Sequence, residues 1–440
     1  MSKKLQFIIY AVAFLGCVGT DFIGADQDAW ADGAMARTWN QIASDALVNV
    51  GIPAPHGGPA HVGVNWAIVQ IAVYDAVNSI DGGHYRPVAT LINAPTGASA
   101  DAAVAQAAHD VLVSIVPGQQ ASLDAQLARS LATIPDGQAT MDGIAVGQQV
   151  AAAILANRAG DGRFGSVAYT FGPPDPGVYQ PTPPSFGSPI VPYVKDIRPF
   201  TMSSGSEFRP KPPPALTSQK WARAYNEVKS LGDLNSAVRT AEQSEIAVFW
   251  TENTPRQWNR AIRNYAAQLN LDRMDTARLF ALTNTAMADA WIGCSDGKAA
   301  YNFWRPITAI RNGDSDGNSQ TAGDPTWTPL VTTPTHQEYL ANHGCISTAA
   351  SQALKTFFHN DRTVDFSMDS TVAGTIVHHF ARFTDAGALA GDARIFGGIH
   401  YDFSVRAGQK LGRQVVNNLK TQCFFSRVDD CDEDSDEDSQ

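Results

Sequence analysis

The chain has 440 residues, of which 44% are hydrophobic and 17% are charged. This composition supplies enough apolar side chains for a large buried core and excludes a chain that is disordered throughout. The formal charge is -11, but eight of the acidic residues lie between Asp429 and Asp438, so the rest of the chain carries only about -3. A near-neutral body gives no reason to expect a nucleic-acid partner.

The N-terminus has the pattern of a secretory signal. Lys3 and Lys4 precede an apolar run, Leu5–Val18, that is shorter than the roughly 20 residues a transmembrane helix needs. Small residues around Ala31 offer a cleavage point. We therefore expect residues 1–31 to be removed on export to the periplasm or the cell exterior, and no transmembrane helix in the mature chain. An uncleaved membrane anchor is the alternative.

Helix signals dominate the rest of the chain. From Val62 to Ile80 apolar residues recur at steps of three and four, as a helix facing a core requires. Ser218 is a possible helix cap. The predicted helices are 62–80, 100–116, 141–158, a block within 218–288, 347–358, 371–383 and 404–419. We predict an all-α fold: a large helical bundle, formed by two packed four-helix-type bundles, over residues 32–425, followed by a disordered acidic tail at 426–440.

Residues 173–214 differ from the helical blocks, because they contain 13 of the 25 prolines. Proline lacks an amide donor and disfavours helical angles at the preceding residue, so this segment cannot be a regular helix. One interpretation is a linker between two helical domains. Its apolar residues, Tyr179 and Phe186 among them, favour the other: an ordered, irregular excursion that packs over the bundle and shapes a pocket rim.

Three clusters of basic residues and histidines lie between Gly293 and Asp402. They are Lys298-x6-Arg305-Pro306, the segment 338–344 that contains Asn342 and His343, and Arg394-x5-His400. Each cluster alone is typical of a solvated surface or a helix start. Their neighbours are apolar, however, and charges in apolar surroundings are costly unless an anion pairs with them.

Three cations and two histidines in such surroundings suit a site for a tetrahedral oxyanion. The arginine fork matches phosphate-like oxygens, and lysine adds a point charge. If His343 opens a helix, the amides and dipole of that helix also favour an anion. One histidine can attack or ligate the central atom while the other moves a proton.

The order and spacing of these motifs resemble those of the superfamily of vanadium-dependent haloperoxidases and type 2 phosphatidic acid phosphatases. The segment from Trp66 to Asn78 is similar to the large exported haloperoxidase-like branch. The resemblance implies that the oxyanion is bound by Lys298, Arg305, Arg394 and the backbone amide of Asn342. It also implies that His400 is the vanadate ligand in a peroxidase, or the nucleophile in a phosphatase, and that His343 is the acid–base partner.

Three positions depart from the family pattern. Ala341 stands where the family has a serine that contacts the oxyanion, and Ala393 replaces the serine before the arginine. Ser404 stands where an aspartate follows the last histidine, which leaves Asp402 or Ser404 as candidates for orienting His400.

The sequence therefore predicts an enzyme that uses vanadate and hydrogen peroxide to oxidise a halide or a small organic substrate. The family resemblance implies that vanadium acts as a Lewis acid without changing oxidation state. His336, seven residues before His343, is similar to a histidine of the bromoperoxidases, so bromide is the expected halide. The alternatives are an acid phosphatase that binds phosphate at the same site, with a phospho-histidine intermediate, and a degenerate oxyanion-binding protein.

Oligomeric state and disulfide pairing stay open. Four cysteines remain after signal cleavage, at 294, 345, 423 and 431, and they allow three pairings in an oxidising compartment.

Overall fold

The structure is a computed structural model that describes residues 32–51, 59–190, 192–422 and 425–428. The predicted signal (1–31), Cys423, Cys431 and most of the predicted acidic tail lie outside the described residues. Cys294 and Cys345 are buried free thiols, and their Sγ atoms lie 2.6 Å apart.

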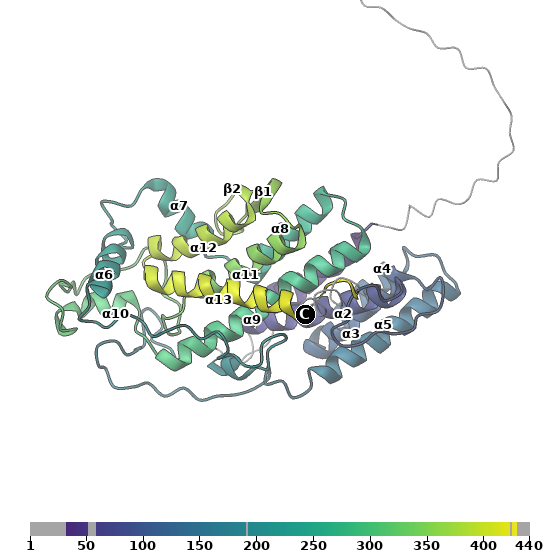
Figure 1. Cartoon of the computed structure of the whole chain (residues 1–440), viewed down its shortest axis with the longest axis horizontal. Helices are drawn as coiled ribbons and strands as arrows, with labels where there is room; N and C mark the ends of the chain where they lie inside the picture. The colour runs from purple at the N-terminus through teal and green to yellow at the C-terminus, as the bar shows by residue number, and fades with distance from the viewer. Residues whose placement is uncertain (1–31, 52–58, 191, 423–424, 429–440) are drawn as a thin grey trace, which may run out of the picture. The chain divides into compact units, whose positions relative to one another are not determined.

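The described residues form thirteen α-helices and one two-stranded sheet, which confirms the all-α prediction (Figure 1). The elements are α1 (Ala34–Ser44), α2 (Pro59–Ile80), α3 (Ala100–Ile115), α4 (Gln120–Leu131), α5 (Gln138–Asn157), α6 (Gln219–Leu231), α7 (Ala241–Phe249), α8 (Thr254–Gln268), α9 (Arg273–Tyr301), α10 (Pro306–Arg311), α11 (Asn342–Phe357), β1 (Arg362–Asp369), β2 (Val377–Arg382), α12 (Phe383–Phe396) and α13 (Asp402–Thr421).

Several predicted helices appear within a few residues of their expected bounds. Ser218 caps α6 by accepting a hydrogen bond from the Trp221 amide. In α2, every residue from His61 to Ser79 is buried, and polar residues such as Gln70 and Asp75 are buried together with the apolar ones. The predicted block 218–288 contains four helices, α6 to α9, rather than one continuous element.

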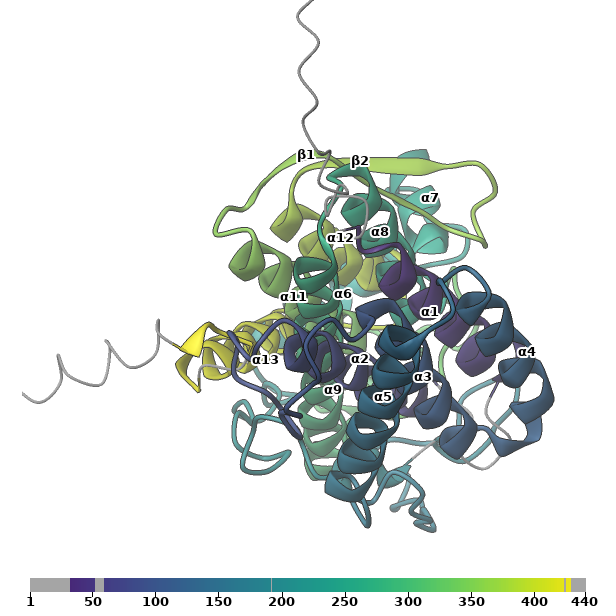
Figure 2. The same cartoon turned by 90° about the vertical axis from the view of Figure 1, so that its right-hand side faces the viewer.

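Helix α9 lies between two groups of helices (Figures 1 and 2). On one side it packs along α2, which in turn packs against α3 and α5. On the other side it packs against α11, and α11 packs against α12 and α13. Since α9 is shared, its side chains are buried almost continuously from Leu279 to Cys294.

The predicted helix 371–383 is wrong. Its second half is β2, which pairs antiparallel with β1 to form a hairpin beside α8 and α12 (Figures 1 and 2). Gly374, at a φ of +67°, lies in the connecting turn, in a conformation that a helix does not contain. Phe366 and Phe380 face each other across the strands and are buried, whereas His379 is exposed. Pairing across the hairpin therefore overrides the local helical pattern.

The proline-rich segment is an ordered excursion over the bundle, as one of the two interpretations expected. The buried Tyr179 donates its amide to the Asn302 carbonyl just after α9. The amides of Phe200 and Thr201 donate to the carboxylate of Asp289 in the middle of α9, at 2.7 and 2.8 Å. The segment is therefore attached to the central helix at two points.

Helix α5 bears on the expectation that the mature chain has no transmembrane helix. Among the described residues, α5 alone is long and apolar enough to cross a membrane by length and composition, which is weak evidence for a membrane span. In this structure α5 packs closely on α3. A Cβ at Gly143 or Gly147 would lie only 2.2 or 2.6 Å from a backbone carbonyl oxygen of the segment Ser99–Ala103.

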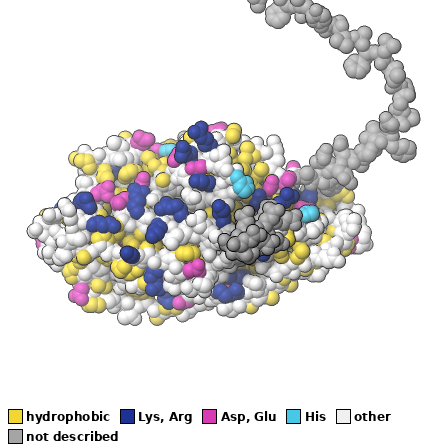
Figure 3. Space-filling model, in the orientation of Figure 1, with side chains coloured by type: hydrophobic (Ala, Val, Ile, Leu, Met, Phe, Trp, Pro, Cys, Tyr) yellow, Lys and Arg dark blue, Asp and Glu magenta, His cyan; other side chains and the backbone are white. Residues whose placement is uncertain are grey.

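The charged side chains are dispersed. On the face shown in Figure 3, Lys and Arg side chains form separate groups, with acidic and uncharged side chains between them.

Candidate oxyanion site

Six of the residues that the sequence singled out lie at helix ends. They are Lys298 at the end of α9, Arg305 before α10, Asn342 and His343 at the start of α11, Arg394 at the end of α12, and His400 before α13. These ends meet because α11 packs against α9, α12 and α13.

A cavity of about 650 Å³ opens where the helix ends meet. Six of the seven predicted site residues line it: Lys298, His336, Asn342, His343, Arg394 and His400. The seventh, Arg305, contacts both His336 and His400. The structure thus brings all seven residues together, although they come from three separate stretches of sequence: 298–305, 336–343 and 394–400.

The three cations are buried. Lys298, Arg305 and Arg394 are each at most 5% exposed. Burial lowers the pKa of Lys298 to about 8, that of Arg305 to about 10 and, together with the charge of Arg305, that of Arg394 to about 9. The carboxylate of Glu338 acts in the opposite direction, because its charge raises the pKa of Lys298 and of Arg305. Burial raises the pKa of Glu338 itself to about 7. The site therefore carries an excess of positive charge.

Lys298 does not present a free donor. Its ammonium group donates to the carbonyls of Gln337 at 2.7 Å, Glu338 at 3.0 Å and Leu340. An ammonium group has three N–H donors, so all three are engaged by the loop that precedes α11. Lys298 thus fixes this loop and acts on an anion in the cavity through its charge.

The two arginines differ in how many donors are free. Arg305 donates to the His336 carbonyl, the Ile399 carbonyl, His336 Nδ1 and His400 Nε2. Arg394 donates to the Trp250 carbonyl at 2.8 Å, and its buried Nε has no partner. Arg394 also has no carboxylate partner among the described residues. It is therefore the cation best placed to donate to an added anion.

His400 has a defined tautomer. Its Nε2 accepts a hydrogen bond from Arg305 Nη1 at 3.1 Å, because an arginine can only donate. The proton therefore lies on Nδ1, which donates to Glu338 Oε1 at 2.8 Å. Burial and the nearby cations, Arg305 first, hold the pKa of His400 well below its usual range. The ring is neutral and directs a lone pair from Nε2.

Glu338 is the residue that the sequence reasoning missed. Of the two expected orienting groups, Asp402 accepts instead from Arg406 at 2.8 Å, whereas Ser404 lies beside Glu338, whose pKa its hydroxyl helps to lower. Glu338 is fully buried and also accepts from the Tyr401 amide at 3.1 Å. It precedes His400 by 62 residues, and no motif spacing connects the two.

His343 lies in the first turn of α11. Its Nε2 is 3.2 Å from the Thr254 hydroxyl, and burial together with the charge of Arg394 holds its pKa well below the usual range. Helix α11 begins at Asn342, and Ala341 provides no side chain to cap it. The positive end of the helix therefore faces the cavity without a competing cap.

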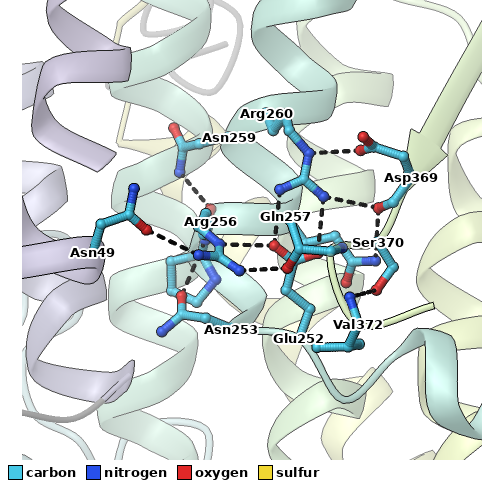
Figure 4. Close-up of polar contacts among 12 residues, drawn as sticks. Asn49, Glu252, Asn253, Arg256, Gln257, Asn259, Arg260, Asp369, Ser370 and Val372 are labelled. Carbon is cyan, nitrogen blue, oxygen red and sulfur yellow. Dashed lines mark hydrogen bonds and ion pairs between the residues drawn. The ribbon is translucent and has the colours of Figure 1, made fainter. Parts of the chain in front are cut away.

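Figure 4 shows how the segment that contacts His343 and Arg394 is held. This segment, Trp250–Thr254, supplies the Trp250 carbonyl and the Thr254 hydroxyl, and the sequence reasoning did not identify it. Its Glu252 accepts hydrogen bonds from Arg256 and Arg260, each at 2.8 Å. Burial alone would raise the pKa of Glu252, but these bonds and the Thr371 amide lower it to about 2. The ion-pair network fixes one wall of the cavity.

Comparisons with known proteins find vanadium haloperoxidases among the proteins similar to this chain. Residues 278–424 match the family model described as "VCPO second helical-bundle domain". A vanadium chloroperoxidase from Curvularia inaequalis is 28% identical over 152 residues, which cover 29% of this chain and 24% of that protein. The chain belongs to the vanadium haloperoxidase superfamily.

Solved structures extend the likeness to almost the whole chain. A bacterial vanadium-dependent iodoperoxidase superimposes with a TM-score of 0.76 at 25% identity, covering 90% of this chain and 98% of the other. A holo-type bacterial vanadium-dependent chloroperoxidase gives a TM-score of 0.70 at 16% identity, covering 90% and 99%, and shares the fold. The segment that matches the curated relative spans about a quarter of that protein's length.

Vanadate, the cofactor that membership of the vanadium haloperoxidase superfamily implies, fits these residues. The buried positive charge exceeds the nearby negative charge, and Arg394 Nε is a buried donor without a partner. The lone pair of His400 Nε2 suits a ligand, and the start of α11 favours an anion.

Proposed function

We propose that the chain is a vanadate-dependent haloperoxidase that oxidises halide with hydrogen peroxide and favours bromide over chloride. The observation that carries the proposal is the uncompensated positive charge of Lys298, Arg305 and Arg394 around the lone pair of His400. Buried charge of one sign is costly unless an ion completes the site, and a tetrahedral oxyanion matches both the charge and the donors.

Each protein group has a defined part in this proposal. His400 would hold vanadate through Nε2, because its Nδ1 is bonded to Glu338. Arg394 would donate its free N–H groups, and Arg305 Nη1, which now donates to Nε2, would become available to the anion. The bound vanadate supplies Lewis acidity that activates hydrogen peroxide toward a halide.

His343 is the proposed proton carrier. Its low pKa keeps the ring neutral, so it can accept a proton from hydrogen peroxide and later return it. The Thr254 hydroxyl and the start of α11 hold the ring at the cavity wall.

The preference for bromide rests on His336. This residue lines the cavity, and its Nδ1 lies 2.9 Å from Arg305 Nη2, so it is close to the site proposed for the anion. An imidazole there would weaken the electrophilicity of the activated peroxide, and bromide and iodide are easier to oxidise than chloride. The similarity to an iodoperoxidase also supports a preference for halides that are easier to oxidise than chloride.

A side-by-side assay tests the proposal against the phosphatase alternative. One sample of the purified chain is loaded with vanadate and given hydrogen peroxide with bromide, and bromination of phenol red is followed. A second sample without vanadate is given p-nitrophenyl phosphate. We expect bromination that requires vanadate and exceeds chlorination. Phosphoester hydrolysis without any bromination would contradict the proposal, and inactivity in both assays would indicate a binding protein.

We also propose that the chain is exported. The support is the pattern of Lys3 and Lys4 followed by a short apolar run, Leu5–Val18.

A further inference from the structure

The cavity is much larger than the anion proposed for its floor. Its volume is about 650 Å³. A tetrahedral oxyanion occupies roughly the volume of a few water molecules, at about 30 Å³ each. Pockets of about 300 to 1,000 Å³ hold organic molecules of drug size. The space beyond the charged floor is therefore sufficient for an organic molecule with one or two rings.

Four apolar or aromatic residues that line this space are together called the apolar wall: Val167, Tyr169, Ile190 and Trp291. Trp291 belongs to α9, Ile190 belongs to the proline-rich segment that packs over the bundle, and Val167 and Tyr169 lie just before that segment. Val167 and Ile190 remain 39% and 46% exposed, although they are large aliphatic residues beside a cavity. An apolar ligand would cover them, and the rings of Tyr169 and Trp291 offer surfaces for packing against another ring.

The wall is fixed in position. The Tyr169 hydroxyl is 2.6 Å from Asn302 Oδ1, and the Ile190 amide donates to the Thr335 carbonyl at 3.0 Å. Asn302 ends α9 one turn after Lys298, and Thr335 immediately precedes His336. The apolar wall is therefore tied to the same two stretches that form the charged floor, as in a preformed binding site.

We infer that the apolar wall binds an electron-rich aromatic molecule, such as a phenol, and that this molecule is brominated inside the cavity. The inference rests on the proposed function, which supplies the oxidised halide at the floor. An electrophilic bromine reacts with ring π electrons, so the bound substrate must be electron-rich. A ring held against Tyr169 and Trp291 would present a restricted set of carbon atoms to the floor.

The chemistry balances with the reagents of the proposed function. Hydrogen peroxide, bromide and a proton give hypobromous acid and water, and bromide is oxidised while peroxide is reduced. Hypobromous acid and the aromatic C–H then give a C–Br bond and water. In this second step the ring carbon is oxidised, the bromine is reduced, and the displaced proton leaves in the water molecule.

Thymol, a phenol with distinguishable ortho and para positions, is the probe. Its binding to the vanadate-loaded chain is first measured by calorimetry without peroxide or bromide. Bromination is then run with excess taurine, which traps hypobromous acid in solution, and the para-to-ortho ratio is compared with that given by hypobromous acid alone. We expect saturable binding, product that persists with taurine, and a ratio different from that of the free reagent.

Ile190→Arg places a charge in the apolar wall and should weaken thymol binding by about tenfold or more, with the product ratio moving toward that of the free reagent. Val364→Arg is the matched control, because Val364 is 70% exposed on β1 and outside the cavity. The Val364→Arg variant should change neither the thymol affinity nor the product ratio. If Ile190→Arg does not fold, Val167→Arg makes the same test.

The failures of the two proposals can be distinguished. Bromide oxidation that proceeds with the free-reagent ratio, complete suppression by taurine and no thymol binding would overturn the aromatic site and leave the peroxidase proposal standing. Absence of bromide oxidation would overturn the peroxidase proposal. In that case thymol binding that is lost in Ile190→Arg would retain the aromatic site without the bromination step, and absence of binding would overturn both.

Discussion

Replacing Glu338 by glutamine should weaken vanadate binding by about 10- to 100-fold. The carboxylate accepts the Nδ1 proton of His400 at 2.8 Å and is fully buried, so this is a charge-assisted hydrogen bond shielded from water. Such bonds contribute roughly 1.5 to 3 kcal/mol, which corresponds to the stated range. Loss of the partner that orients a metal-binding histidine has a comparable effect on metal affinity.

Glutamine keeps an acceptor oxygen but loses the charge, and its amide group can also donate to Nδ1. In that orientation the proton would move to Nε2, the atom that is needed as the ligand. Vanadate affinity is measured by titration followed with vanadium NMR at pH 8, above the pKa of about 7 that Glu338 has in the wild type. Nitrogen NMR of the histidine rings reports the tautomer directly.

Two further variants distinguish loss of the His400 orientation from a general loss of fold stability. Glu245→Gln breaks another carboxylate–histidine pair, with His378 at 3.1 Å, outside the cavity, and should leave the affinity unchanged. Ser404→Asp in the Glu338→Gln background restores a carboxylate next to the site and should recover part of the affinity. A folded Glu338→Gln protein that binds vanadate within twofold of the wild type would refute the assigned role.

Four other predictions follow from the same geometry. Arg394→Ala removes the least engaged cation and should weaken vanadate or phosphate binding by about tenfold or more, as measured by calorimetry. His400→Ala should abolish stable vanadate binding, whereas His343→Ala should retain binding and lose turnover; equal loss of binding in both would contradict the separate roles. His336→Phe should shift the ratio of bromide to chloride oxidation toward chloride, and an unchanged ratio would remove His336 from the site. The low pKa of Glu252 stabilises the fold above the ordinary carboxyl pKa and is lost as pH falls toward 2, so Glu252→Gln should lower the free energy of unfolding by roughly 3 kcal/mol at pH 7, with the difference shrinking below pH 4.5 in urea titrations.

Local patterns in the sequence were sufficient to predict most helices and to select basic residues that the structure places around one cavity. Apolar residues at steps of three and four over Val62–Ile80 predicted a helix there, and the structure has α2 at this position. The motif order placed Lys298, Arg394 and His400 in one site, and the structure brings them to one cavity.

Features that depend on contacts between distant segments were not predictable. The hairpin at 371–383 forms because Phe380 pairs with Phe366 on another strand, which helical periodicity cannot register. Glu338 meets His400, and Thr254 meets His343, only after α8, α11 and α13 have packed. The engagement of all Lys298 donors by backbone carbonyls is likewise a property of the folded loop, so the motif predicted the charge but not its hydrogen bonds.

The most direct test of the central claim is a titration of the purified chain with orthovanadate at pH 8, followed by addition of phosphate. If the buried cations and His400 form a single oxyanion site, one vanadate should bind per chain and phosphate should displace it competitively. Absence of saturable binding, or binding that phosphate does not affect, would contradict the account.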